Sequence, residues 1–248
     1  MGTQALIQLS LYLGVLLLLA WPMGAWLARI AGEGPVFGLG DRCERAIYRL
    51  AGVDPQSDMS WKQYALAVMA ISVLGVAVVF ALQLLQGALP LNPQKMAAVS
   101  WDSAFNTAVS FVTNTNWQGY GGESTMSYLT QMLALTVQNF LSAATGIAVA
   151  FALIRGLARH SAAGIGNFWV DLVRVTLWVL LPMSIVIALI FVGQGAIQNM
   201  DAYRDVPLVE KLVYEQPKVD AAGQPIKDEK GNPVMEKAST TTQTIAMA

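Results

Sequence analysis

The chain of 248 residues is 55% hydrophobic and 12% charged, whereas about a quarter of the residues in a soluble globular domain are charged. This composition excludes an ordinary water-soluble domain and indicates a lipid bilayer as the surrounding medium. The formal net charge of -1 gives no indication of a nucleic-acid partner, and one cysteine with one histidine excludes a disulfide framework and a Cys/His metal site.

Four apolar segments are long enough to cross a bilayer as helices, for which about 20 residues are needed. They run from about Leu6 to Ala28, Gln63 to Leu85, Met126 to Ile154 and Val175 to Ile197. The first segment has no basic residue before it and Arg29 directly after it, which is the reverse of a secretory signal peptide. We therefore expect an uncleaved helix with an extracytoplasmic N-terminus, and cytoplasmic loops where the arginines gather.

The second and fourth segments share landmarks at one spacing. Trp61 and Trp169 lie at or just before their starts, and the sequences QGAL from Gln86 and QGAI from Gln194 close them, both pairs being 108 residues apart. Chance placement is one explanation. The other is a duplicated unit whose two copies run in the same direction.

A short amphipathic segment lies between the second and third spans. From Asp102 to Val112 a helix would cover only about half of the hydrocarbon thickness, so we expect a half-helix that enters from the outside. Ser100 or Asp102 offers an N-cap. One helical face carries Trp101, Phe105, Ala108, Val109 and Val112, and the other carries Ser103, Asn106, Thr107, Ser110 and Thr113.

Five residues from Thr113 to Trp117 follow the half-helix, and we expect them to be extended and to lead the chain back outward. Irregular backbone at membrane depth is tolerated where it lines a polar cavity. Its uncharged peptide oxygens suit a dehydrated monovalent cation, while a divalent ion would be expected to draw carboxylates. The alternative is an ordinary Thr/Asn turn. Glu123 either attracts cations to the outer mouth or caps the third helix.

Other polar residues are interpreted structurally. Gln138, Asn139 and Ser142 inside the third span predict packing against neighbouring helices. Asp171 and Arg174, three residues apart, predict a local ion pair. The polar tail after residue 199 predicts either a small external hairpin or a partly disordered loop.

Long stretches of the chain resemble one family. NTAVSFVTNTNWQGYGGESTMSYLTQM, LTVQNFLSAATGIAVAFALIRG, MSWKQYALAV, LPLNPQ, NFWVDLVRVTLWVLLP and QGAIQN closely resemble the potassium-translocating A subunit of the bacterial Kdp potassium-uptake ATPase. The likeness covers most of residues 1–200. It implies four helix, pore-loop, helix units around one pore, with an extra helix at each end and with ATP hydrolysis on a separate P-type B subunit.

The resemblance also implies a site and partners. The first potassium filter corresponds to Thr113, Asn114, Thr115 and Asn116, and its flanking residues to Ser110, Gln118 and Glu123. Potassium is then the substrate, and no cofactor is expected. A C subunit and a small F subunit complete the complex in the bacterial cytoplasmic (inner) membrane. The chain itself contains no G-x-x-x-x-G-K-[ST] loop and no DKTG motif, so it is not expected to be catalytic alone.

The expected architecture is an all-α integral membrane protein with a potassium-channel-like repeat and an extra N-terminal helix, ending before a second pore loop. The expected divisions are the extra helix (1–30), a cytoplasmic loop (31–62), the first pore unit (63–155), a second cytoplasmic loop (156–174), the first helix of the second unit (175–198) and an extracytoplasmic polar segment (199–248). Two alternatives to the pump subunit stay open. One is a channel-like potassium transporter subunit of the same superfamily, and the other is a non-conducting membrane scaffold.

Overall fold

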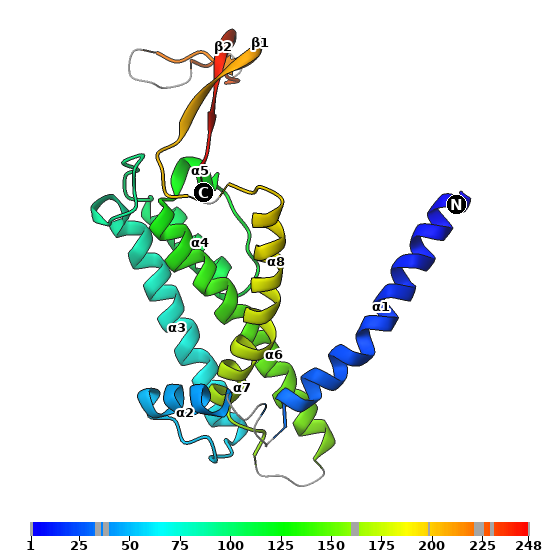
Figure 1. The fold of residues 1–248 in the computed structure, drawn as a ribbon. Helices are drawn as coiled ribbons and strands as arrows, with labels where there is room; N and C mark the ends of the chain where they lie inside the picture. The colour runs from blue at the N-terminus through cyan, green and yellow to red at the C-terminus, as the bar shows by residue number, and fades with distance from the viewer. Residues whose placement is uncertain are drawn as a thin grey trace.

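The computed structural model describes residues 2–32, 36, 40–159, 164–197, 199–220, 226–228 and 231–247. Within this part of the chain, four helical spans are long and apolar enough to cross a membrane, as the sequence predicts (Figure 1). They are α1 (Thr3–Ile30), α3 (Trp61–Leu85), η2 with α6 (Thr130–Thr136 and Val137–Ala158), and α7, η3 and α8 (Phe168–Val175, Thr176–Leu180 and Leu181–Gly193). The fourth span thus begins before Val175.

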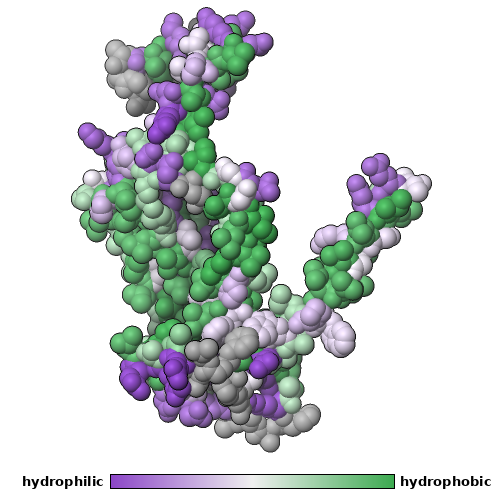
Figure 2. Space-filling view, in the orientation of Figure 1, coloured by the Kyte–Doolittle hydropathy of each residue, from purple (hydrophilic) through white to green (hydrophobic). Residues whose placement is uncertain are grey.

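Shorter elements lie at the two ends of the spans. The amphipathic helix α2 (Gly40–Ala51) crosses the lower end in Figure 1, whereas α4 (Trp101–Val112) and α5 (Gly122–Thr125) lie in the upper half. The turn η1 (Gln86–Ala88) extends α3. Figure 2 shows an apolar middle between more hydrophilic ends, which is the surface pattern of a protein embedded in a bilayer.

The spans α3 and α7–α8 begin and end in similar ways. Ser60 caps α3 in a reciprocal arrangement with Gln63, and Asn167 caps α7 by accepting from two backbone N–H groups. At the other end the C-cap positions are Gln86 and Gln194. Both spans run from the lower to the upper end in Figure 1, and this shared direction is the one that a parallel duplication requires.

Two apolar clusters hold the helices together. The lower cluster joins α1, α3, α6 and α7, and in it the rings of Tyr64 and Phe168 meet edge to face at 5.4 Å. The upper cluster surrounds α4, where Ala104 and Ala108 are fully buried beside Val79 of α3. Alanines allow the backbones of two helices to approach closely. The short helix α4 is therefore fixed by packing along its length.

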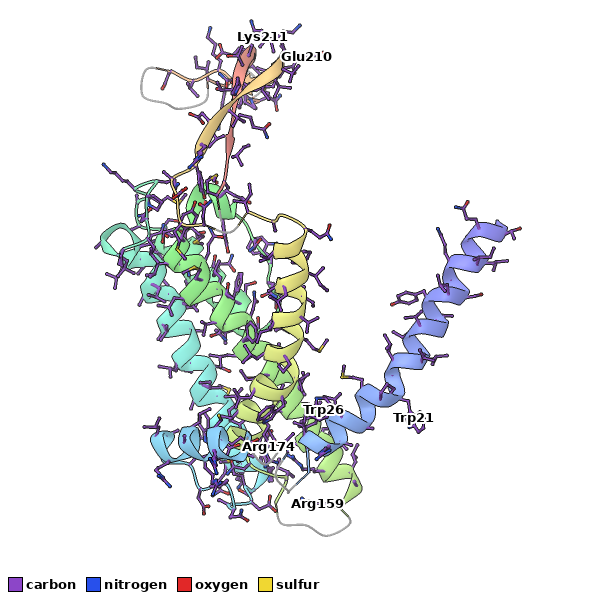
Figure 3. All side chains as sticks on the ribbon, in the orientation of Figure 1. Trp21, Trp26, Arg159, Arg174, Glu210 and Lys211 are labelled. Carbon is purple, nitrogen blue, oxygen red and sulfur yellow. The ribbon has the colours of Figure 1, made fainter. Side chains whose placement is uncertain are left out.

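The polar tail forms an antiparallel hairpin of β1 (Arg204–Pro217) and β2 (Met235–Ile245). Its register shifts between Pro207 and Leu212, where proline cannot donate to the ladder. Figure 3 places Glu210 and Lys211 toward the outer end of the hairpin. Of the two expectations for this tail, the structure has the hairpin, although residues 221–225 and 229–230 lie outside the described ranges.

A tryptophan attaches the end of α1 to the fourth span. Pro182 has no N–H group, so the carbonyl of Trp178, four residues earlier, loses its usual helical donor. That carbonyl accepts a hydrogen bond from Nε1 of Trp26 at 3.0 Å. Elsewhere α1 leans away from the other helices (Figure 1), and its side chains are largely exposed. The Trp26 bond therefore fixes α1 at its lower end.

We expect Trp26→Phe to loosen this attachment. The aromatic surface is kept but the carbonyl of Trp178 loses the hydrogen bond from Trp26, which in this partly buried position we expect to cost about 1–1.5 kcal/mol. Hydrogen exchange in detergent micelles should show faster exchange of amides in the last turns of α1, by roughly tenfold. Trp21→Phe is the control, because Trp21 is 85% exposed and points away from the other helices in Figure 3. Equal protection in both variants would contradict the prediction.

Charged side chains at the lower end pair between helices. Arg155 of α6 donates to both carboxylate oxygens of Asp171 at 2.6 and 2.8 Å. Arg174 donates through Nε to Glu44 of α2 at 3.0 Å, and Figure 3 shows Arg174 at the base of the bundle. The predicted local pair of Asp171 with Arg174 is therefore wrong. Each buried charge has a partner on another helix, which allows the fourth span to begin at Phe168.

Both ion pairs receive further hydrogen bonds. Tyr64 donates to Asp171 at 3.0 Å, and Arg155 donates to the carbonyl of Ala31 at the end of α1. Glu44 accepts from Tyr48 at 3.1 Å and from Nε1 of Trp178 at 2.7 Å. Burial, and then the Glu44 carboxylate, raises the pKa of Tyr48, so that its phenol remains a donor. This polar cluster connects α1, α2, α3, α6 and the fourth span.

Candidate functional site

The half-helix α4 extends from Trp101 to Val112, as expected, and lies beside the C-terminal half of α3 (Figure 1). Ser100 occupies the N-cap position, but its side chain makes no capping hydrogen bond to the helix. Hydrogen bonds from the Ser100 hydroxyl and from the backbone of Ser103 instead lower the pKa of Asp102. Asp102 lies in the first turn of α4, where its ionised carboxylate interacts favourably with the positive end of the helix dipole.

The backbone after α4 alternates in the sign of φ. Thr113 has a φ of -81°, Asn114 has +57° and Asn116 has +54°, while Thr115 is not among the described residues with positive φ. The expected extended conformation of Thr113 to Trp117 is therefore wrong. Asparagine tolerates the left-handed region better than other residues with a β-carbon, which explains its presence at both positions.

Four consecutive N–H groups of this loop turn back onto the end of α4. Thr113 donates to Val109 at 2.9 Å and Asn114 to Phe111 at 3.2 Å. Thr115 and Asn116 both donate to the carbonyl of Ser110, at 3.0 and 3.2 Å. These bonds satisfy carbonyl groups that a helix end leaves without partners, and they are the physical reason that the loop is turned and not extended.

The carbonyl groups of the loop consequently point the other way. In a trans peptide the C=O of one residue is opposed to the N–H of the next, and no cis bond is present in the described chain. The carbonyls of Thr113, Asn114 and Thr115 therefore face away from α4, and within the described residues none of them accepts a hydrogen bond. The Thr113 and Thr115 hydroxyls lie 2.9 Å apart on the side of α4, where the Thr113 hydroxyl is within hydrogen-bond distance of the carbonyls of Val109 and Ser110. The loop presents oxygen atoms without a formal charge.

Side chains from α4 and α6, and a glycine of α3, support this loop. Ser110 donates from its hydroxyl to the carbonyl of Trp117 at 3.0 Å, and Ser142 of α6 donates to Oδ1 of Asn114 at 3.3 Å. Gly75 of α3 leaves room for buried Gln138, because a β-carbon there would lie 2.7 Å from the Gln138 oxygen. Interpreting Ser142 and Gln138 as packing residues was incomplete, since they lie behind the loop.

The outer flank of the loop contacts the hairpin. Gln118 is exposed, and its amide lies 3.4 Å from the Tyr120 hydroxyl. Glu123 belongs to the first turn of α5, which ends at Thr125, so it does not cap the third span. Its backbone carbonyl accepts from the Tyr203 hydroxyl at 2.9 Å, and burial raises the pKa of Tyr203, which therefore stays a donor.

Within the described ranges, no three His, Cys, Asp or Glu side chains come together as a metal site; His160 lies outside those ranges. A cation at the face of the loop that is turned away from α4 would meet uncharged peptide oxygens. Together, the spans, the half-helix and the turned loop are the parts of a helical membrane protein of the pore-loop class.

Comparisons with known proteins identify the family. Residues 10–228 match the family model described as potassium-transporting ATPase A subunit. The chain belongs to this family. A protein from Chromobacterium violaceum named potassium-transporting ATPase potassium-binding subunit is 61% identical over 250 residues, covering 100% of this chain and 41% of that protein. A protein of the same name from Ralstonia pickettii is 63% identical over 244 residues, covering 98% of this chain and 41% of its own length. The chain thus spans about two fifths of the length of these relatives.

Proposed function

We propose that this chain provides a potassium-binding unit of an ATP-driven potassium-uptake complex, with Thr113, Asn114, Thr115 and Asn116 as the filter. The observation that carries the proposal is the direction of the loop's peptide groups. Their N–H groups bind the end of α4, so that three successive carbonyls face away from it. The names of the relatives, which refer to potassium binding, support the choice of ion.

The charge of the loop favours a monovalent ion over a divalent one. Peptide oxygens offer moderate dipoles that can replace the hydration shell of a potassium ion without holding it too tightly. The C-terminal end of α4 adds the negative end of its helix dipole. A calcium site would require carboxylates, and the four filter residues are threonines and asparagines. Ser110, Gln118 and Glu123 flank the filter, and Glu123 adds a negative charge at its mouth.

We further propose the membrane setting and the partners. Arg29 and Arg155 lie in the last turns of α1 and α6, and Arg174 lies in α7 at the base of the bundle; this gathering of arginines supports a cytoplasmic lower end and an extracytoplasmic N-terminus. The membrane is then the bacterial inner membrane. Nucleotide chemistry belongs to a P-type B subunit, with a C subunit and a small F subunit in the complex. This division is consistent with the absence of nucleotide-binding motifs from the sequence.

Gln118→Arg in the full-length protein within its complex tests the function. A cationic side chain roughly 8 Å from the ion opposes binding by about 2 kcal/mol at an effective dielectric constant of about 20. We expect the potassium concentration for half-maximal uptake to rise by roughly thirtyfold. Gln243→Arg adds the same charge to an exposed position of β2 and is the control. An unchanged potassium dependence for Gln118→Arg would favour the scaffold alternative.

A further inference from the structure

The side chain of Gln86, at the end of α3, is completely buried and bonded on every side. Its Nε2 group donates to the carbonyl of Ala97 at 2.7 Å and to the carbonyl of Thr125 at 2.8 Å. Its Oε1 atom accepts from the backbone N–H of Ser127 and from the Thr130 hydroxyl, each at 3.1 Å. Both donors and both acceptor positions of the amide are therefore used.

The partners of Gln86 lie on the two sides of the pore loop. Ala97 precedes α4, whereas Thr125 ends α5, after the turned loop and its outer flank. Because one nitrogen atom donates to both carbonyls, the segment that enters the pore loop (at Ala97) and the segment that leaves it (at Thr125) are held side by side. Ser127 and Thr130 then connect this point to the start of the third span. Gln86 thus joins the two ends of the segment that carries Thr113–Asn116.

Only an amide of this length fits the environment. A carboxylate at residue 86 could not donate to the carbonyls of Ala97 and Thr125, and it would bury a charge. An apolar side chain would leave two acceptors and two donors without this partner, and each unsatisfied buried group costs about 1–3 kcal/mol. In the sequence Gln86 is only a landmark of the repeat, because its contacts are made with residues distant in the sequence.

We propose that Gln86 is a positioning residue of the filter: by joining the two ends of the pore loop, it sets the depth and width at which the carbonyls of Thr113, Asn114 and Thr115 meet the ion. This inference rests on the proposed potassium-binding function. Gln83, one turn earlier on α3, donates to the carbonyl of Ala104 and so holds α4 itself. Gln86 instead holds the segments before α4 and after the pore loop, at Ala97 and Thr125.

The test is Gln86→Leu in the full-length protein, purified in its complex. Two quantities are measured: the potassium concentration for half-maximal ATP hydrolysis and the ratio of rubidium to potassium half-saturation. We expect the first to rise at least tenfold and the second to move toward one, because a slack loop discriminates less by size. The maximal rate at saturating potassium should change much less. A purely structural role would lower the amount of assembled protein without altering the ion ratio.

Asn92→Ala is the matched control. Asn92 belongs to the same polar turn, where its side chain bonds to the backbone of Gln86 and Met96 but not to the segment that leaves the pore loop at Thr125. We expect its ion ratio to stay at the wild-type value. If Gln86→Leu does not assemble, Gln86→Glu decides, since the carboxyl group keeps the length of the side chain and can donate to at most one of the carbonyls of Ala97 and Thr125. A wild-type ion ratio in Gln86→Glu would then overturn the proposal.

The outcomes separate this inference from the proposed function. If Gln118→Arg shifts the potassium dependence but Gln86→Leu keeps wild-type values, the filter stands and the positioning role fails. If ATP hydrolysis by the wild-type complex is independent of potassium, the proposed function itself fails.

Discussion

Asp171→Leu lowers the free energy of unfolding of the full-length protein by about 3–5 kcal/mol. Asp171 is 2% exposed and accepts hydrogen bonds from Nη1 and Nη2 of Arg155 and from the hydroxyl of Tyr64. Leucine leaves the Arg155 guanidinium without a counter-ion in a low-dielectric environment. This is one of the few mechanisms that produce so large an effect from a single substitution. Equilibrium unfolding in bicelles measures the change.

The double variant Arg155→Met/Asp171→Leu distinguishes the loss of a charge from the loss of packing. With both charges removed, apolar side chains of similar length can fill the space, and such replacements are often nearly neutral. We expect it to recover more than half of the stability lost in Asp171→Leu. Recovery should be incomplete, because the carbonyls of Ala31 and Ile165 also lose Arg155 as a donor. A double variant no more stable than Asp171→Leu would contradict the electrostatic explanation.

We expect Asn114→Val in the full-length protein to abolish high-affinity potassium uptake and Asn114→Gly to retain it. Asn114 has a φ of +57°, a conformation that is strained for a β-branched residue and relaxed for glycine. Valine therefore drives the peptide out of the alternating pattern and turns at least one carbonyl away from its neighbours. Both variants lose the hydrogen bond between the Asn114 side chain and Ser142. A difference between them therefore reports the preference of residue 114 for positive φ.

Uptake of potassium by cells growing at low external potassium measures the difference between these two variants. We expect the half-saturating concentration to rise at least a hundredfold for Asn114→Val and less than tenfold for Asn114→Gly, the smaller effect reflecting one lost side-chain hydrogen bond of about 1 kcal/mol. Equal defects would show that the Asn114 amide matters and its φ does not.

Local patterns in the sequence were sufficient to predict the spans and the half-helix. The length of a helix compared with the bilayer thickness distinguishes α4, which is too short to cross, from α3, which is long enough. Turn-forming residues between polar segments predict a hairpin as one alternative for the tail. Such features depend on neighbouring residues and on the solvent, so they can be recognised without knowing which elements meet.

Pairings between helices could not be predicted in the same way. The spacing of Asp171 and Arg174 favoured a local pair, but burial against α6 and α2 gave each of them a partner far away in the sequence. The roles of Gln86 and Ser142 likewise depend on segments that only the fold brings together.

The turned loop is a different case, because its sequence contains a local signal for positive φ. Asparagine recurs at alternate positions, 114 and 116, and it is the residue most tolerant of positive φ after glycine. The length needed to return to the surface favours an extended path for residues 113–117, but it takes no account of hydrogen bonding at the end of the helix. The carbonyl groups at the end of α4 attract the N–H groups of the loop and decide the conformation instead.

The alternation of φ along Thr113–Asn116 also means that this stretch has no single handedness. At 114 and 116 the backbone adopts the conformation natural to a mirror-image amino acid, while Thr113 keeps that of an ordinary L-residue. D-alanine would be relaxed at the two asparagine positions and strained at Thr113. In the signs of its φ angles, the loop therefore resembles a polymer of alternating chirality.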